Sequence, residues 1–133
     1  PKGSARVLVK LEYENPTGSM KDRMALAMVE SAEADGRLRP GGSVVEYTGG
    51  STGVSLAFVC ASKRIPLQIV TSDAFSQEKR DHMRALGANA VEIESEGGRM
   101  TKELIRSMMA RPATATRPPP SNPSRPTNRP RSS

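Results

Sequence analysis

The chain has 133 residues, of which 35% are hydrophobic and 26% charged, and 20 Lys and Arg against 14 Asp and Glu give it a net charge of +6. This length allows one small domain. A single cysteine, Cys60, excludes an internal disulfide and a cysteine-based metal site. No apolar run reaches the roughly 18 residues of a membrane-spanning helix. Because we also find no secretory signal pattern, we expect a cytoplasmic protein.

The positive charge is concentrated in residues 111–133. This tail contains five arginines and seven of the 11 prolines, but no acidic, aromatic or large aliphatic residue. Without those arginines, 15 basic residues stand against 14 acidic ones in residues 1–110, so the whole-chain charge gives no argument for nucleic-acid binding. A segment that cannot bury apolar area stays unfolded. We therefore predict a domain over residues 1–110 and a disordered tail over residues 111–133.

Residues 1–110 alternate predicted strands and helices. The apolar run of residues 6–11 predicts a strand, and residues 20–34 predict a helix that ends before Gly36 and Pro40. The later predicted elements are a strand at 43–47, a helix at 54–62, a strand at 67–71, a helix at 76–86, a strand at 90–93 and a helix at 101–109. This order predicts an α/β fold, a three-layer arrangement of a parallel sheet with flanking helices.

A turn separates the first predicted strand from the first helix. An Asn-Pro pair and Gly18 are typical turn residues, and Ser19 followed three residues later by Asp22 has the pattern of a capping box. Lys21 then lies in the first helical turn, where the helix dipole opposes a positive charge. The neutral amine, which is the nucleophilic form of lysine, is therefore favoured there. The alternative is a solvated lysine without a chemical role.

A glycine-rich loop follows the second predicted strand and precedes the second helix. It consists of Thr48, Gly49, Gly50, Ser51, Thr52 and Gly53. Glycines let the backbone approach a ligand closely, and free N–H groups at a helix start bind anions. The loop matches neither a P-loop, because no lysine follows Gly53, nor the dinucleotide-binding pattern. The alternative is a tight turn that serves only the packing of helix on sheet.

Two other residue types give little support to a catalytic or metal site. Cys60 lies in an apolar helical run, so we expect it to be a packed core residue. His82 is the one histidine and lies in a charged helix, so we expect it to be solvated. No metal is predicted.

Both the lysine segment and the glycine-rich loop resemble segments of a known family. The sequence Asn-Pro-Thr-Gly-Ser-Met-Lys-Asp-Arg-Met-Ala, residues 15–25, resembles the cofactor-lysine segment of the cysteine synthase family. These are pyridoxal-phosphate-dependent enzymes with the tryptophan synthase β-like fold. The resemblance continues through the loop to about Met109, with both motifs in the expected order. It implies that residues 1–110 are a partial domain of this kind, an N-terminal fragment in which Lys21 forms a Schiff base with pyridoxal phosphate.

In the resembled family, the glycine-rich loop usually reads Thr-Ser-Gly-Asn-Thr-Gly and holds the α-carboxylate of the substrate. Four positions match here, while Gly49 replaces the serine and Ser51 replaces the asparagine that hydrogen-bonds the cofactor's ring hydroxyl. The resemblance therefore implies that residues 48–53 bind a substrate carboxylate and that Ser51 supplies a shorter contact to the cofactor.

The reaction that the resemblance implies is a β-replacement or β-elimination on a β-substituted amino acid. Lys21 would remove the Cα proton as general base, the β-substituent would leave, and a nucleophile such as sulfide would add. The resemblance thus implies a fragment of a transferase or lyase of cysteine biosynthesis. It also implies an amino-acid substrate and a homodimer for full-length members. The lack of a long apolar run predicts no membrane partner.

Two parts of the resembled family are not found after Met109. They are the loop that binds the cofactor phosphate and the serine or threonine that partners the pyridine nitrogen. One alternative function is therefore a catalytically inactive, truncated remnant, or an interaction module whose basic tail binds acidic partners or nucleic acid. An unrelated nucleotide-binding α/β domain is the third hypothesis.

Overall fold

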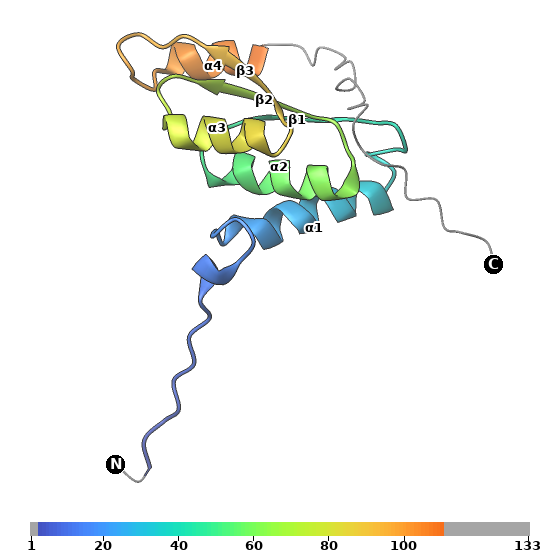
Figure 1. Ribbon diagram of the computed structural model, residues 1–133, viewed down its shortest axis with the longest axis vertical. Helices are drawn as coiled ribbons and strands as arrows, with labels where there is room; N and C mark the ends of the chain where they lie inside the picture. Colours follow the sequence, from blue (N-terminus) through green and yellow to red (C-terminus); the bar gives the residue numbers. More distant parts are fainter. Residues whose placement is uncertain (1–2, 111–133) are drawn as a thin grey trace, which may run out of the picture.

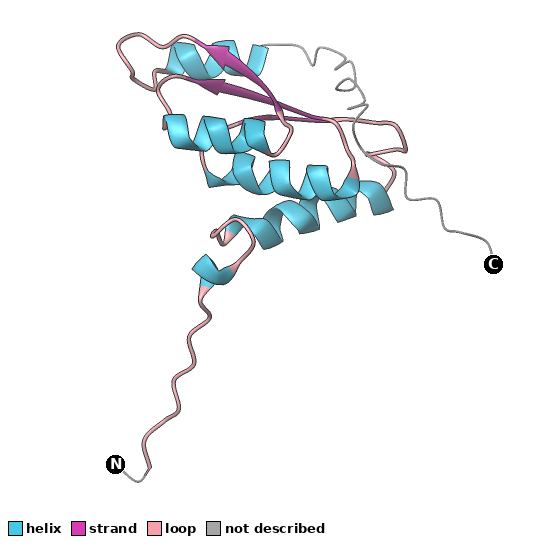
Figure 2. Cartoon of the chain, viewed as in Figure 1, coloured by secondary structure: helices cyan, strands magenta, loops and turns pink. Residues whose placement is uncertain are grey.

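The computed structural model describes residues 3–110, which form one 3-10 helix, four α-helices and three strands (Figure 1, Figure 2). In chain order these are η1 (Glu12–Glu14), α1 (Lys21–Ala34), β1 (Val44–Tyr47), α2 (Ser51–Lys63), β2 (Leu67–Ser72), α3 (Gln77–Ala85), β3 (Asn89–Ile93) and α4 (Lys102–Ala110). Every helix and strand predicted from residue 20 onward is present, with small shifts at the ends. The predicted alternation of helices and strands is confirmed.

The three strands form a parallel sheet in the order β1-β2-β3. Val44 of β1 lies opposite Leu67 of β2, and Gln68 of β2 lies opposite Asn89 of β3. All six residues of β2 are buried because this strand has a neighbour on each side and helices over both faces. Parallel pairing, as predicted, brings the carboxyl ends of all three strands to one edge of the sheet.

Helices cover both faces of the sheet, which confirms the predicted three layers. Ile69 belongs to a core cluster with residues of α1, α2 and α3, whereas the next residue, Val70, packs with Leu104 and Met108 of α4. Successive strand residues point to opposite faces of a sheet, so α4 lies on the opposite face from the other helices. Figure 1 shows α2 and α3 along one face, α1 beyond α2, and α4 on the other side.

The second helix, α2, lies at the centre of the domain. Its buried residues are Gly53, Val54, Ser55, Leu56, Ala57, Val59 and Cys60. Burying a single valine or leucine side chain contributes about 1.5–3 kcal/mol relative to leaving it exposed. The helix ends at Lys63, because the next residue, Arg64, has a left-handed backbone conformation (φ 59°) that cannot continue an α-helix. The predicted burial of this apolar helix is confirmed.

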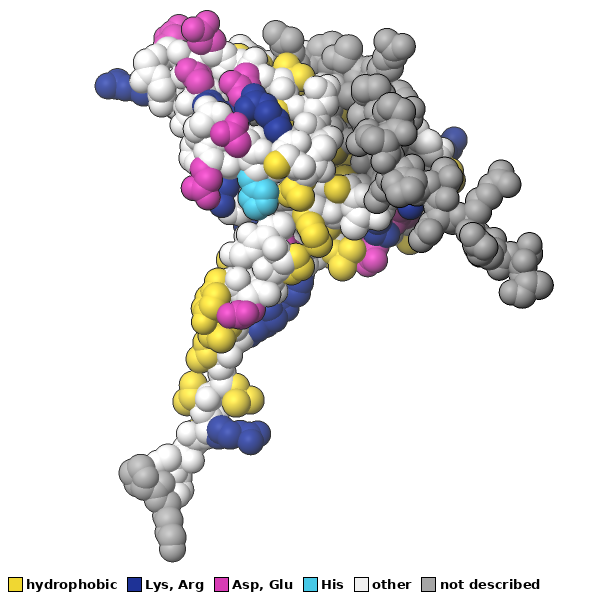
Figure 3. Space-filling view, in the orientation of Figure 1, with side chains coloured by type: hydrophobic (Ala, Val, Ile, Leu, Met, Phe, Trp, Pro, Cys, Tyr) yellow, Lys and Arg dark blue, Asp and Glu magenta, His cyan; other side chains and the backbone are white. Residues whose placement is uncertain are grey.

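The strand predicted at residues 6–11 is wrong. These residues do not pair with any described strand, and the side chains of Val7, Leu8 and Val9 are 81%, 78% and 77% exposed. Figure 3 shows this segment extending away from the body of the molecule. An apolar alternating sequence favours extended backbone, but a strand forms only where another strand supplies hydrogen-bond partners. None of residues 3–110 does so here.

The predicted tail at residues 111–133 lies outside the described residues, so its disorder and the domain boundary at residue 110 stay predictions. Within residues 3–110, no helix combines the length and apolar character needed to cross a membrane.

A substitution at Gly53 tests whether α2 packs closely on α3. A Cβ at this position would meet the Met83 sulfur of α3 and, at 2.7 Å, the Thr48 Cγ2 atom. We expect Gly53→Ala to lower the free energy of unfolding in urea by about 1–3 kcal/mol, the cost of overpacking a core. Gly50→Ala is the matched control, because a Cβ at Gly50 meets nothing within 4 Å. Equal unfolding midpoints for the two variants would contradict the packing argument.

Candidate active site

The turn before α1 is held by a side-chain amide. The Asn15 side chain donates a hydrogen bond to the Ser19 carbonyl at 2.9 Å, and the Gly18 N–H donates to the Asn15 carbonyl at 2.8 Å. Gly18 has a positive φ of 72°, a conformation that favours glycine. The turn therefore ends in a fixed geometry at Lys21, the first residue of α1.

The predicted capping box is wrong. The N-cap of α1 is Met20, which makes no side-chain cap hydrogen bond, and Ser19 lies one residue earlier, where its hydroxyl accepts a hydrogen bond from the Lys21 N–H at 3.1 Å. Asp22, however, does not reach back to Ser19. Its carboxylate accepts from the Thr17 N–H at 2.7 Å, from the Thr17 hydroxyl at 2.5 Å and from the Ser55 hydroxyl at 2.5 Å. A buried carboxylate takes the strongest donors around it, and here one of them comes from α2.

Asp22 therefore ties the start of α1 to the first turns of α2. Ser55 is fully buried, and only 6% of the Asp22 surface is exposed. Burial alone would raise the pKa of Asp22, but the hydrogen bonds from Ser55 and Thr17 outweigh burial and hold this pKa below its ordinary value. The carboxylate is thus charged and buried, and its three hydrogen bonds connect the turn before α1 with α2.

The glycine-rich loop runs from the carboxyl end of β1 into α2. The Thr48 N–H donates to the Val70 carbonyl at 3.0 Å, and the Gly50 N–H donates to the Thr48 hydroxyl at 3.3 Å. At the start of α2, the N–H groups of Ser51 and Thr52 have no acceptor in the part of the chain that the structure describes. Free N–H groups at a helix start attract anions, and open α/β sheets bind ligands at the carboxyl ends of their strands.

The hydrogen bond from Ser55 to Asp22 holds the start of α1, where Lys21 lies, beside the second turn of α2, the helix that follows this loop. The Lys21 side chain is half-buried, and within residues 3–110 its amine forms no hydrogen bond or ion pair. Lys63 shows the contrast, because its amine contacts Glu33 at 2.7 Å and Glu30 at 3.9 Å. Of the predicted site residues, Gly49 and Gly53 are buried, and Thr48, Gly50, Ser51 and Thr52 are half-buried.

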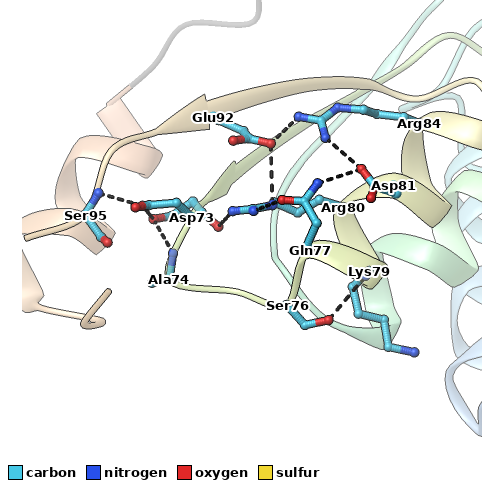
Figure 4. Close-up of polar contacts among 11 residues, drawn as sticks. Asp73, Ala74, Ser76, Gln77, Lys79, Arg80, Asp81, Arg84, Glu92 and Ser95 are labelled. Carbon is cyan, nitrogen blue, oxygen red and sulfur yellow. Dashed lines mark hydrogen bonds and ion pairs between the residues drawn. The ribbon is translucent and has the colours of Figure 1, made fainter. Parts of the chain in front are cut away.

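A second turn, from β2 into α3, lies against the loop. The ring of Phe75 occupies the position that a Cβ at Gly49 would take. Figure 4 shows the polar contacts around this turn, in which Asp73 accepts from the Ser95 N–H at 2.7 Å and Arg80 contacts Glu92 of β3 at 3.5 Å. Sequence reasoning missed Phe75, because no pattern near it indicates a contact 26 positions earlier in the chain.

Ser55 was also missed, although the sequence contains a signal for it. It is a hydroxyl residue inside an otherwise apolar run, from Val54 to Cys60. A buried hydroxyl requires a hydrogen-bond partner, and that requirement points to a polar group on a neighbouring helix. The sequence alone does not identify Asp22 as that partner.

The side chains of Cys60 and His82 show no arrangement for catalysis or metal binding in the part of the chain that the structure describes. Cys60 is a core residue, as predicted, and burial together with the charge of Glu33 raises the pKa of its thiol to about 11. His82 is half-buried on α3 rather than fully solvated. Among residues 3–110 there is no group of three or more His, Cys, Asp and Glu side chains arranged to hold a metal ion.

Comparisons with known proteins identify a family for this arrangement. Residues 2–128 match the family described as pyridoxal-phosphate dependent enzyme. The chain is 51% identical over 88 residues to a cysteine synthase of Staphylococcus aureus, which covers 66% of this chain and 28% of that protein. It is 42% identical over 98 residues to cysteine synthase B of Salmonella typhimurium, covering 74% of this chain and 32% of that protein. The chain thus spans about a third or less of these relatives' length.

Solved structures give the same result for the fold. A hydrogen sulfide-producing enzyme from Fusobacterium nucleatum matches with a TM-score of 0.66 and 37% identity, over 75% of this chain and 32% of that one. O-ureido-L-serine synthase matches with a TM-score of 0.62 and 41% identity, over 76% of this chain and 32% of that one. The resemblance inferred from the lysine segment and the glycine-rich loop is confirmed at the level of the family.

The tie through Asp22 predicts a measurable dependence of stability on pH. Because the pKa of Asp22 is lower in the folded than in the unfolded chain, its contribution is fully present above the ordinary value of about 3.9. The contribution is lost as the pH falls through the lowered folded-state value. We expect Asp22→Asn to lower the free energy of unfolding at pH 7 by about 1–3 kcal/mol and to remove this part of the acid dependence.

Asp35→Asn is the matched control for this measurement. Asp35 is exposed and pairs with its neighbour Arg37 at 2.8 Å, a surface pair whose loss costs less than about 1 kcal/mol. Urea unfolding of both variants between pH 7 and pH 3 separates the two cases. If Asp22→Asn destabilises the chain no more than Asp35→Asn at pH 7, the tie does not hold the two helices together.

Proposed function

Because this chain belongs to the pyridoxal-phosphate-dependent enzyme family, we propose that it supplies two working segments of a cysteine synthase-like enzyme. These are the cofactor lysine, Lys21, and the loop that holds the substrate carboxylate, residues 48–53. The substrate is a β-substituted amino acid, and the reaction is a β-replacement or β-elimination. One observation carries the proposal: the Ser55 hydroxyl donates to the Asp22 carboxylate at 2.5 Å, which fixes the helix that begins with Lys21 against the helix that begins with the loop.

The described residues fit one end of the cofactor. The amine of Lys21 is free of protein partners within residues 3–110, and it is available to bond the cofactor aldehyde. Ser51, half-buried at the start of α2, is the residue we assign to the cofactor's ring hydroxyl. When bound, pyridoxal phosphate supplies an electron sink for the electron pair left at the substrate Cα.

The glycine-rich loop fits a carboxylate. The unpaired N–H groups of Ser51 and Thr52 stand at the positive end of the α2 dipole, where a carboxylate gains charge-assisted hydrogen bonds. The hydroxyls of Ser51 and Thr52 add two further donors. The Thr48 hydroxyl already accepts the Gly50 N–H, and its own hydrogen remains to be donated. A Cβ at Gly50 would meet nothing within 4 Å, so this glycine leaves the surface beside these N–H groups open, whereas Gly49 and Gly53 pack against Phe75 and Met83.

Lys21 carries the proton transfer in this proposal. As a free amine, the Lys21 side chain would take the proton from the substrate Cα as general base. Asp22 has a different role, because both of its carboxylate oxygens already accept hydrogen bonds from Thr17 and Ser55, and these hold its pKa below the ordinary value. It orients α1, and thereby the lysine, without contacting the substrate.

A titration tests the carboxylate loop without the cofactor. We expect glycine to shift the backbone amide resonances of residues 49–53 in NMR spectra of the chain, because free N–H groups at a helix start bind anions. Glycinamide, which lacks the carboxylate, is the matched control ligand and leaves these resonances unchanged. If glycine moves other resonances while those of the loop stay still, the carboxylate site is elsewhere.

Reductive trapping tests the lysine. With excess pyridoxal phosphate followed by borohydride, we expect peptide mapping to find the cofactor label on Lys21 above every other lysine. Lys79 is the matched control, since it also lies in the first turn of a helix and is half-buried. Lys21→Ala removes the main label, whereas Lys79→Ala leaves it. A label spread evenly over the lysines, or unchanged in Lys21→Ala, contradicts the assignment.

A further inference from the structure

Gly49 lies against an aromatic ring. The three atoms nearest to a Cβ built on Gly49 are the Cγ, Cδ1 and Cδ2 atoms of Phe75, all closer than any real Cβ contact. Gly49 has no positive φ, so its backbone does not require glycine. The ring of Phe75 requires it, because only a residue without a side chain leaves room for the ring at that place.

Hydrogen bonds within the turn between β2 and α3 fix the backbone of Phe75. The Phe75 N–H donates to the Ser72 carbonyl at 3.1 Å, and the Ala74 N–H donates to the Ser72 hydroxyl at 3.2 Å. The guanidinium of Arg80, a buried residue of α3, donates to the same Ser72 carbonyl at 3.1 Å. Figure 4 shows Asp73 of this turn in contact with Ser95, which follows β3, and Arg80 of α3 beside the turn. The turn that carries Phe75 is therefore braced by neighbouring elements on both sides.

The ring is also part of the core on the α4 side of the sheet. Phe75 is half-buried and packs against the cluster of Val70, Leu104 and Met108. It thus links that cluster to the backbone of the glycine-rich loop. A side chain that core packing fixes on one side presents a fixed shape to whatever lies on its other side.

We propose that Phe75 is a specificity-determining residue, forming an apolar wall of the carboxylate site at Gly49 and limiting the size of the amino acid that the loop accepts. This inference rests on the proposed function, since it assigns a boundary to the same site. Gly49 has no side chain, and the ring of Phe75 lies in the place where a side chain at position 49 would be. A wall of this kind discriminates between ligands by volume, about tenfold or more for each methylene that does not fit.

The test compares two probe ligands, glycine and L-methionine, by NMR titration of the amides of residues 49–53. We expect Phe75→Ala to raise the affinity for L-methionine relative to glycine by about tenfold, equal to about 1.4 kcal/mol. Phe75→Leu keeps a branched apolar side chain in the core and gives a smaller change in the same direction. Phe58→Ala is the matched control, because it removes the chain's other phenylalanine, which is half-buried on α2.

A second measurement tests the contact itself. We expect Gly49→Ser to lower the urea midpoint of unfolding in the unaltered background and to cost much less in the Phe75→Ala background. Such coupling in a double-mutant cycle identifies residues that touch. Gly49→Ser that costs the same in both backgrounds overturns the contact and the inference with it.

The ligand titration separates this inference from the proposed function. If both amino acids shift the loop resonances but Phe75→Ala and Phe75→Leu leave the affinity ratio unchanged, Phe75 does not determine specificity and the carboxylate site still stands. If neither amino acid shifts the loop in the unaltered chain, the carboxylate site and this inference both fail.

Discussion

The buried carboxylate of Asp22 determines how the two halves of the candidate site lie. It accepts hydrogen bonds from Thr17 in the turn before α1 and from Ser55 inside α2. A charged group in the interior is stable only when donors surround it, so this geometry is strongly constrained. Because Lys21 directly precedes Asp22 and the glycine-rich loop opens α2, the constraint on the carboxylate becomes a constraint on the lysine and the loop.

The parallel sheet provides the second constraint. Its central strand, β2, is buried along its whole length, and its carboxyl end leads into the turn that carries Phe75. The carboxyl end of β1 leads into the glycine-rich loop. Parallel pairing of β1 with β2 therefore brings these two turns side by side, and the contact between Phe75 and Gly49 follows from that arrangement. The proposed site thus combines one helix start with two strand ends.

Local patterns in the sequence predicted most of the fold and indicated which residues to propose for the site. Apolar runs and turn residues located every element from residue 20 onward, because helix and strand periodicity depend on residues close together in the chain. The two motifs around Lys21 and residues 48–53 pointed to the pyridoxal-phosphate-dependent enzyme family, which the comparisons confirm. Individual positions within the loop could be named because glycine and hydroxyl residues mark it directly.

What the sequence by itself determined was therefore the order of elements, the parallel α/β fold and the two motifs. Only the tertiary structure decided the rest, because each remaining question depends on a partner distant in the chain. Residues 6–11 have strand-like sequence, but no described strand pairs with them, so they remain extended and exposed. Asp22 fits a capping pattern, but a hydroxyl 33 positions away competes for its carboxylate. Gly49 is a glycine because Phe75, from another turn, fills the space that any side chain would need.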